Sequence, residues 1–156
     1  MGRILALDVG TKRVGIALGD EETKLASPFD AFPKAQGRAE SQIAALVATE
    51  QITKIIVGLP LSEDGSLNDQ CLLVIRFCRR LKRRLNVPLL CVDEYLTSLE
   101  SQEILGISGR KERQIRGSGA VDAMSAALIL KSFFDSGLGF AVPDIEQDSD
   151  IDTSAD

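Results

Sequence analysis

The segment from Ile4 to Leu18 places the strongest constraint on how this chain can fold. It reads ILALDVGTKRVGIAL, with an apolar run on each side of a polar segment that contains Gly10. Two short apolar runs joined by such a turn predict a β-hairpin. Asp8 falls where the first strand ends, and a carboxylate at the end of a buried strand needs hydrogen bonds, a cation or water to offset its desolvation. The chemistry of the chain should therefore centre on Asp8.

Beyond the hairpin, apolar periodicity predicts alternating strands and helices. The expected strands are residues 24–32, 53–58 and 87–92, and the expected helices are residues 37–51, 68–85, 97–105 and 119–134. Pro28 favours an edge or a bulge for the first of these strands. Residues 106–118 are glycine-rich and basic, as expected of a loop. This order predicts an α/β domain in which a mixed five-stranded sheet carries helices on both faces.

The absence of histidine narrows the chemistry that is open to the chain. Without histidine there is no Ser-His or Cys-His nucleophile pair and no HExxH zinc site. The three cysteines form no CxxC motif and are odd in number, so buried free thiols are expected. If the chain is an enzyme, carboxylates or lysines must do the catalysis.

Charge is distributed unevenly along the 156 residues. Six of the 23 acidic residues fall within residues 144–156, which hold no basic residue, so most of the chain is close to neutral despite a net charge of −5. The length suffices for one core, and we expect one folded domain over residues 1–138 and an acidic, disordered tail over residues 139–156. No apolar run is long enough for a membrane span and no secretory signal is present, which predicts a cytoplasmic protein with no membrane partner.

Three carboxylates stand at comparable places in the predicted elements. Asp8 and Glu94 each follow a buried strand, and Asp122 lies at the head of a buried helix. Each has an ordinary structural explanation on its own, as a turn residue, a solvated residue or a helix-dipole partner. Together they would need a counter-charge, and oxygen-only ligands select Mg²⁺ or Mn²⁺. Two such ions can activate water and stabilise a leaving oxygen in phosphodiester cleavage, although Asp93 leaves open which neighbouring carboxylate faces the metal.

Four strings carry a family resemblance, in the order ALDVGTKRVGIAL, GLPLSEDG, VDEYLTS and VDAMSAALILKSFF. Together they resemble the YqgF/RuvX family, a ribonuclease-H-like group described as Holliday junction resolvases and pre-16S rRNA processing nucleases. The resemblance implies a ribonuclease-H-like fold and a metal-dependent nuclease that acts on structured nucleic acid in ribosome maturation. It also implies that the catalytic, metal-binding acids are Asp8, Glu94 and Asp122. One departure is Tyr95, which stands where the family has an arginine.

Two basic segments are candidates for substrate binding. The hairpin turn offers N–H groups and cations that could hold a phosphate near Asp8, and the loop before the last helix could close over a nucleic-acid backbone. Their residues are Gly10, Thr11, Lys12, Arg13, Arg110, Lys111, Arg113 and Arg116. A plain turn with a solvated lysine is an equally good interpretation of Lys12. A third basic cluster, at residues 76–84, is spread around its helix and is expected to be mostly solvated surface.

The favoured function is processing of the 5′ end of pre-16S rRNA, with pre-rRNA and ribosomal particles as partners. The alternatives are resolution of Holliday junctions in branched DNA and non-catalytic RNA binding in ribosome assembly, since phosphate contacts do not identify the nucleic acid. A DxGT turn also resembles that of actin-like ATPases and sugar kinases, but those enzymes close two domains around ATP, and one domain is expected here. A monomer suits an RNA end and a homodimer suits a symmetric junction.

Overall fold

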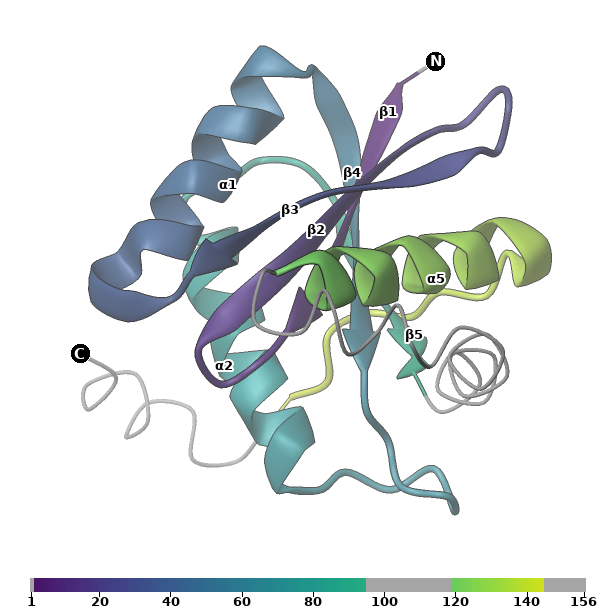
Figure 1. Cartoon of the computed structure of the whole chain (residues 1–156). Coiled ribbons are helices and arrows are strands. Elements are labelled where there is room, and N and C mark those ends of the chain that lie inside the picture. The colour runs from purple at the N-terminus through teal and green to yellow at the C-terminus, as the bar shows by residue number, and fades with distance from the viewer. Residues whose placement is uncertain (1, 95–118, 145–156) are drawn as a thin grey trace.

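The hairpin at the start of the chain forms the centre of a five-stranded sheet (Figure 1). The computed structural model describes residues 2–94 and 119–144. The strands are β1 (Arg3–Val9), β2 (Arg13–Asp20), β3 (Ala26–Pro33), β4 (Ile52–Leu59) and β5 (Leu89–Asp93), in the spatial order β3-β2-β1-β4-β5. Strands β1, β2 and β3 form an antiparallel meander, whereas β1, β4 and β5 run parallel to one another. The predicted mixed sheet is confirmed.

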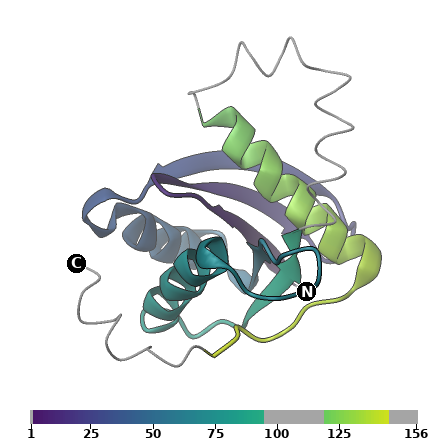
Figure 2. The same ribbon diagram turned by 90° about the horizontal axis from the view of Figure 1, so that it is seen from below.

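Helices cover both faces of this sheet, as predicted. On one face lie the 3-10 turn η1 (Ala35–Gly37), α1 (Arg38–Thr49) and α2 (Asp69–Lys82), while α5 (Ala120–Ser136) crosses the other. Figure 2 shows the sheet between these two helical layers. The side chain of Asn68 caps α2 by accepting a hydrogen bond from the Cys71 N–H. α2 ends at Lys82, earlier than the predicted end at residue 85.

Alternation along β1 divides the apolar core into two parts. Leu5 and Leu7 pack in the larger cluster under α1 and α2, and Ile4 and Ala6 pack in the smaller cluster under α5. Because successive side chains of a strand point to opposite faces, both faces of this central strand are buried. The position of Asp8 in the same alternation places it on the α5 side.

The two edges of the sheet have different protection. On β3, Pro28 pairs with Ala17 across a register shift, and the intervening Phe29 is left 48% exposed. This confirms both the edge and the bulge that Pro28 predicts. On β5, Cys91 exchanges two backbone hydrogen bonds with Phe140, with N–O distances of 2.7 and 2.9 Å.

The chain after α5 remains packed on the domain for several residues. Val142 contacts the larger core cluster, and Arg79 donates to the Pro143 carbonyl and to the Asp144 carboxylate. The folded body therefore extends beyond the expected boundary at residue 138, at least to Asp144. The expected helix over residues 97–105, the loop over residues 106–118 and the residues after 144 lie outside the described residues.

The cysteines follow the expectation from their number and spacing, since Cys71, Cys78 and Cys91 are all buried and unpaired with one another in disulfides. Within residues 2–94 and 119–144, no helix has the length and apolarity needed to cross a membrane.

Candidate active site

Asp8 lies near the end of β1 and faces the helix that covers that side of the sheet. It pairs with Gly15 of β2 in the antiparallel register, and it continues the side of β1 that carries Ile4 and Ala6. Asp8 is therefore held by backbone pairing on the central strand, next to the first turn of α5. Neighbouring apolar residues make this a poor environment for an isolated charge.

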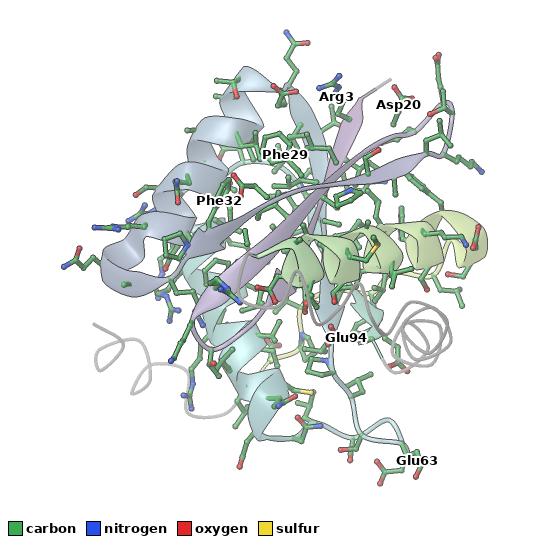
Figure 3. All side chains as sticks on the ribbon, in the orientation of Figure 1. Arg3, Asp20, Phe29, Phe32, Glu63 and Glu94 are labelled. Carbon is green, nitrogen blue, oxygen red and sulfur yellow. The ribbon has the colours of Figure 1, made fainter. Side chains whose placement is uncertain are left out.

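Glu94 belongs to the same side of the sheet as Asp8. Along β5, Leu90 and Val92 pack under α5, whereas Leu89 and Cys91 pack on the opposite face. Glu94 continues the first of these two series, so strand alternation directs Glu94 toward α5. Figure 3 shows Glu94 beneath α5, where β4 and β5 end.

The carboxyl groups of Asp8 and Glu94 share a hydrogen bond. The pKa of Asp8 is raised well above its ordinary value, first by burial, then by the charge of Glu94 and that hydrogen bond, and last by the charge of Asp122. The structure thus brings Asp8, Glu94 and Asp122 near enough to influence one another.

Asp122 lies in the first turn of α5, where a carboxylate is favoured by the helix dipole. Its Oδ2 atom accepts a hydrogen bond of 2.8 Å from the Nε atom of Arg13. The side chain of Asp122 is 31% exposed and that of Arg13 is 41% exposed, so the ion pair lies at the rim of the site. Arg13, which we expected to contact substrate, is thus engaged with an acid of the site in this structure.

Two glycines allow these elements to come close together. A Cβ atom added at Gly15 would lie 2.0 Å from the backbone oxygen of Asp122, and one at Gly58 would lie 2.5 Å from Cδ1 of Ile129 and 3.4 Å from Cδ of Glu94. Any side chain at either position would push α5 or Glu94 away from the sheet. The missing side chains therefore set the spacing of the three acids.

The hairpin turn forms one wall of a pocket of about 420 Å³ that Gly10, Thr11, Lys12, Arg13 and Asp122 line. The Gly10 N–H donates to the Arg13 carbonyl at 2.8 Å, which closes the turn. That N–H is therefore committed to the fold, and Gly10 contributes turn geometry instead of a phosphate-binding donor. Thr11 and Lys12 are exposed, so their side chains are accessible from solvent.

Lys34 is a residue of this region that sequence reasoning missed. Its Nζ atom donates to the Gly10 carbonyl at 3.0 Å and lies 5.6 Å from the centre of the Phe77 ring. Its pKa is lowered, first by burial and then by the charge of Arg80. The bond links residues 24 positions apart, and no local sequence pattern marks such a contact. Lys34 supports the turn from the α2 side.

The basic residues outside the turn have different outcomes. Arg110, Lys111, Arg113 and Arg116 lie outside the described residues, as does Tyr95. On α2, Arg79 binds Asp144 and Arg80 binds the buried Glu40, while Arg84, just after the helix, donates to Ser41. Part of this cluster therefore holds the fold together instead of forming only a solvated surface.

A divalent cation fits the chemistry of the three acids, because all of their donor atoms are carboxylate oxygens. Among the described residues, however, no group of three acidic or thiol side chains is already arranged as a metal site. The pairing of Asp122 with Arg13 is consistent with that finding.

The fold is that of ribonuclease-H-like nucleases, which are hydrolases of phosphodiester bonds. The solved structure of Thermus thermophilus RuvC in complex with a Holliday junction substrate superposes with a TM-score of 0.56 at 15% identity, over 90% of this chain and 99% of that chain. The Fowlpox virus resolvase in complex with Holliday junction DNA superposes with a TM-score of 0.53 at 12% identity, over 87% of this chain and 99% of that chain. At such identities the likeness shows the fold alone.

Sequence relatives define the family. A protein of Syntrophus aciditrophicus (strain SB), with the provisional name pre-16S rRNA nuclease, is 43% identical over 86% of this chain and 89% of its own length. A protein of Roseiflexus sp. (strain RS-1) with the same provisional name is 36% identical over 86% of this chain and 95% of its own length. The family model for RuvX, described as Holliday junction resolvase, matches residues 2–136. The chain belongs to the RuvX family and is a nuclease.

Proposed function

We propose that this chain is a divalent-metal-dependent nuclease of the cytoplasm that processes the precursor of 16S rRNA. Asp8, Glu94 and Asp122 are its catalytic and metal-binding residues in this proposal. The observation that carries it is the Asp8 carboxyl group, whose pKa is raised first by burial and then by two further acids from distant parts of the chain. Three carboxylates gathered at one place require a cation when ionised.

The protein's own residues would position the cation and the nucleic acid. Asp8 and Glu94, whose side chains are hydrogen bonded to each other, would hold Mg²⁺ or Mn²⁺ at strand ends that the sheet fixes. When bound, the cation supplies activation of water and stabilisation of the leaving oxygen. Thr11 and Lys12, exposed beside the site, would bind a phosphate of the backbone. Lys34 would keep the turn in place through the Gly10 carbonyl.

Relatives favour RNA over branched DNA as the substrate. The proteins with 43% and 36% identity both carry a name that refers to pre-16S rRNA, and ribosomal precursor particles would then be its partners. The description of the family as Holliday junction resolvases supports the alternative, a four-way DNA junction. The basic residues Arg110, Lys111, Arg113 and Arg116 stay predicted contacts in either case.

Cleavage assays on both substrates test the proposal. The wild-type protein should cut an rRNA precursor with an extended 5′ end in Mn²⁺ or Mg²⁺, and EDTA should stop the reaction. Asp8→Asn and Glu94→Gln should remove cleavage while circular dichroism and the RNA affinity measured in EDTA stay unchanged. Asp135→Asn, which removes an exposed acid at the other end of α5, is the matched control.

Each alternative has its own result. Cleavage of a four-way junction but not of the RNA precursor would replace the RNA substrate with branched DNA. Metal-dependent cleavage that survives in both acidic variants would contradict the assignment of the site. RNA binding with no cleavage of either substrate would identify a non-catalytic assembly factor.

A further inference from the structure

The ion pair between Arg13 and Asp122 joins the phosphate-binding turn to the acidic site. Arg13 begins β2 directly after the turn, and Asp122 lies in the first turn of α5, 109 positions later. The Nε atom of Arg13 donates a hydrogen bond of 2.8 Å to the Oδ2 atom of Asp122. One residue expected to bind substrate and one expected to bind metal are therefore partners in this structure.

Each acid of the site has a polar partner in this structure. Asp8 and Glu94 are hydrogen bonded to each other, and the guanidinium group of Arg13 neutralises Asp122. The carboxylate oxygen that Arg13 occupies is one that a divalent cation would use. Guanidinium and cation compete for it, because the same lone pairs serve both.

The same guanidinium group lines the pocket beside Thr11 and Lys12. The backbone of Arg13 is fixed in β2 by pairing with Pro33 on β3, so the residue stays at the wall of this pocket whichever partner its side chain has. A released guanidinium at this place is a bidentate donor for a phosphate group. The position therefore serves either Asp122 or a nucleic-acid backbone.

We propose that Arg13 holds Asp122 in the metal-free protein and exchanges that partner for a substrate phosphate when a divalent cation binds. Arg13 is then a positioning residue that couples the two binding events. The inference rests on the proposed function, because it requires a cation at the three acids. Linkage makes the coupling reciprocal, so metal should strengthen nucleic-acid binding by the same factor as nucleic acid strengthens metal binding.

Titration calorimetry with Mn²⁺ alone measures the competition in the full chain. The pair is partly exposed, and such pairs contribute little, so Arg13→Gln should bind Mn²⁺ about 1.5-fold to 5-fold more tightly than the wild type. Lys12→Gln removes the same charge from the adjacent, exposed position and controls for the general loss of positive charge. Arg13→Lys keeps the charge and should restore affinity toward the wild-type value.

Fluorescence anisotropy with a labelled RNA hairpin measures the coupling. Gel analysis after each titration checks that the RNA is intact. Mn²⁺ should raise the RNA affinity of the wild type by a larger factor than that of Arg13→Gln, with the two factors differing about twofold or more. The RNA affinity of Arg13→Gln in Mn²⁺ should also depend less steeply on salt, because one phosphate contact is lost.

Two results would overturn the inference while the proposed function stands. One is an equal gain in Mn²⁺ affinity for Arg13→Gln and Lys12→Gln. The other is a coupling factor that Arg13→Gln leaves unchanged. Asp8→Asn separates these from failure of the proposed function: if that variant binds Mn²⁺ as tightly as the wild type, the acids are not the metal site, and both proposals are wrong.

Discussion

Replacing Gly15 with alanine should damage the site. The added Cβ would lie 2.0 Å from the Asp122 oxygen and 2.4 Å from its carbonyl carbon. Nonbonded heavy atoms are best separated by about 3.5 to 4.0 Å, so β2 and the first turn of α5 must together move apart by roughly 1.5 to 2 Å. Both contacts are with backbone, which cannot rotate away as a side chain can.

The displacement has two measurable effects. Overpacking of this kind reduces the free energy of unfolding by about 1 to 3 kcal/mol, which urea denaturation measures. A shift of about 1 Å at Asp122 should reduce the cleavage rate in Mn²⁺ by about 100-fold, because catalysis depends on the positions of the groups involved. Cleavage is measured under conditions in which the variant is fully folded, so that the two effects stay separate.

Gly139→Ala is the matched control for Gly15→Ala. A Cβ at Gly139 would lie 3.3 Å from a side-chain atom of Leu90, which can adjust. It should therefore change stability and cleavage little. If Gly15→Ala cleaves at the wild-type rate and unfolds at the wild-type urea concentration, α5 does not approach β2 as closely as the structure shows, and the reasoning is refuted.

Two further predictions concern buried acids. The pKa of Asp8 lies well above its unfolded value near 3.8, so the folded protein binds this proton more tightly than the unfolded chain does. The contribution of Asp8 to the stability of the metal-free protein is therefore fully present below the unfolded pKa and is lost as pH rises through the folded pKa. Urea titrations in EDTA should show this decline in stability with rising pH, and Asp8→Asn should make the decline smaller. An unchanged pH profile in the variant would contradict the assignment. Arg80→Ala leaves Glu40, only 7% exposed, without its ion-pair partner, which should cost about 1 to 3 kcal/mol of unfolding free energy. Arg84→Ala, at the hydrogen bond to Ser41, should cost less than about 0.5 kcal/mol, and equal losses in the two variants would argue against a buried pair.

Much of the fold could be predicted because its determinants are local. The alternation at Leu5 and Leu7, the turn at Gly10 and the proline at position 28 each specify a conformation through neighbouring residues. The side of the sheet that Glu94 faces follows from the same alternation, once it is known which residues of β5 face α5. Sequence alone does not show which residues of β5 face α5, and for this reason Asp93 stayed an alternative.

The parts of the site that sequence reasoning missed depend on long-range contacts. Arg13 and Asp122 are 109 positions apart, and Lys34 meets Gly10 from the far end of β3. Glu40 lies in the first turn of α1 and is also buried against Arg80. In each case the partner is chosen by the packing of elements, and a charged residue in a sequence does not show whether it will face solvent, substrate or another charge.

The hydrogen bonds between Phe140 and Cys91 have a consequence for behaviour at high concentration. A sheet edge with unpaired backbone groups is a template on which a second molecule can add a strand. Pro28 and its bulge blunt this template on β3, and the segment after α5 covers it on β5. Truncation before Phe140 would leave the Cys91 backbone open to a neighbouring molecule, so this short segment guards the protein against edge-to-edge aggregation.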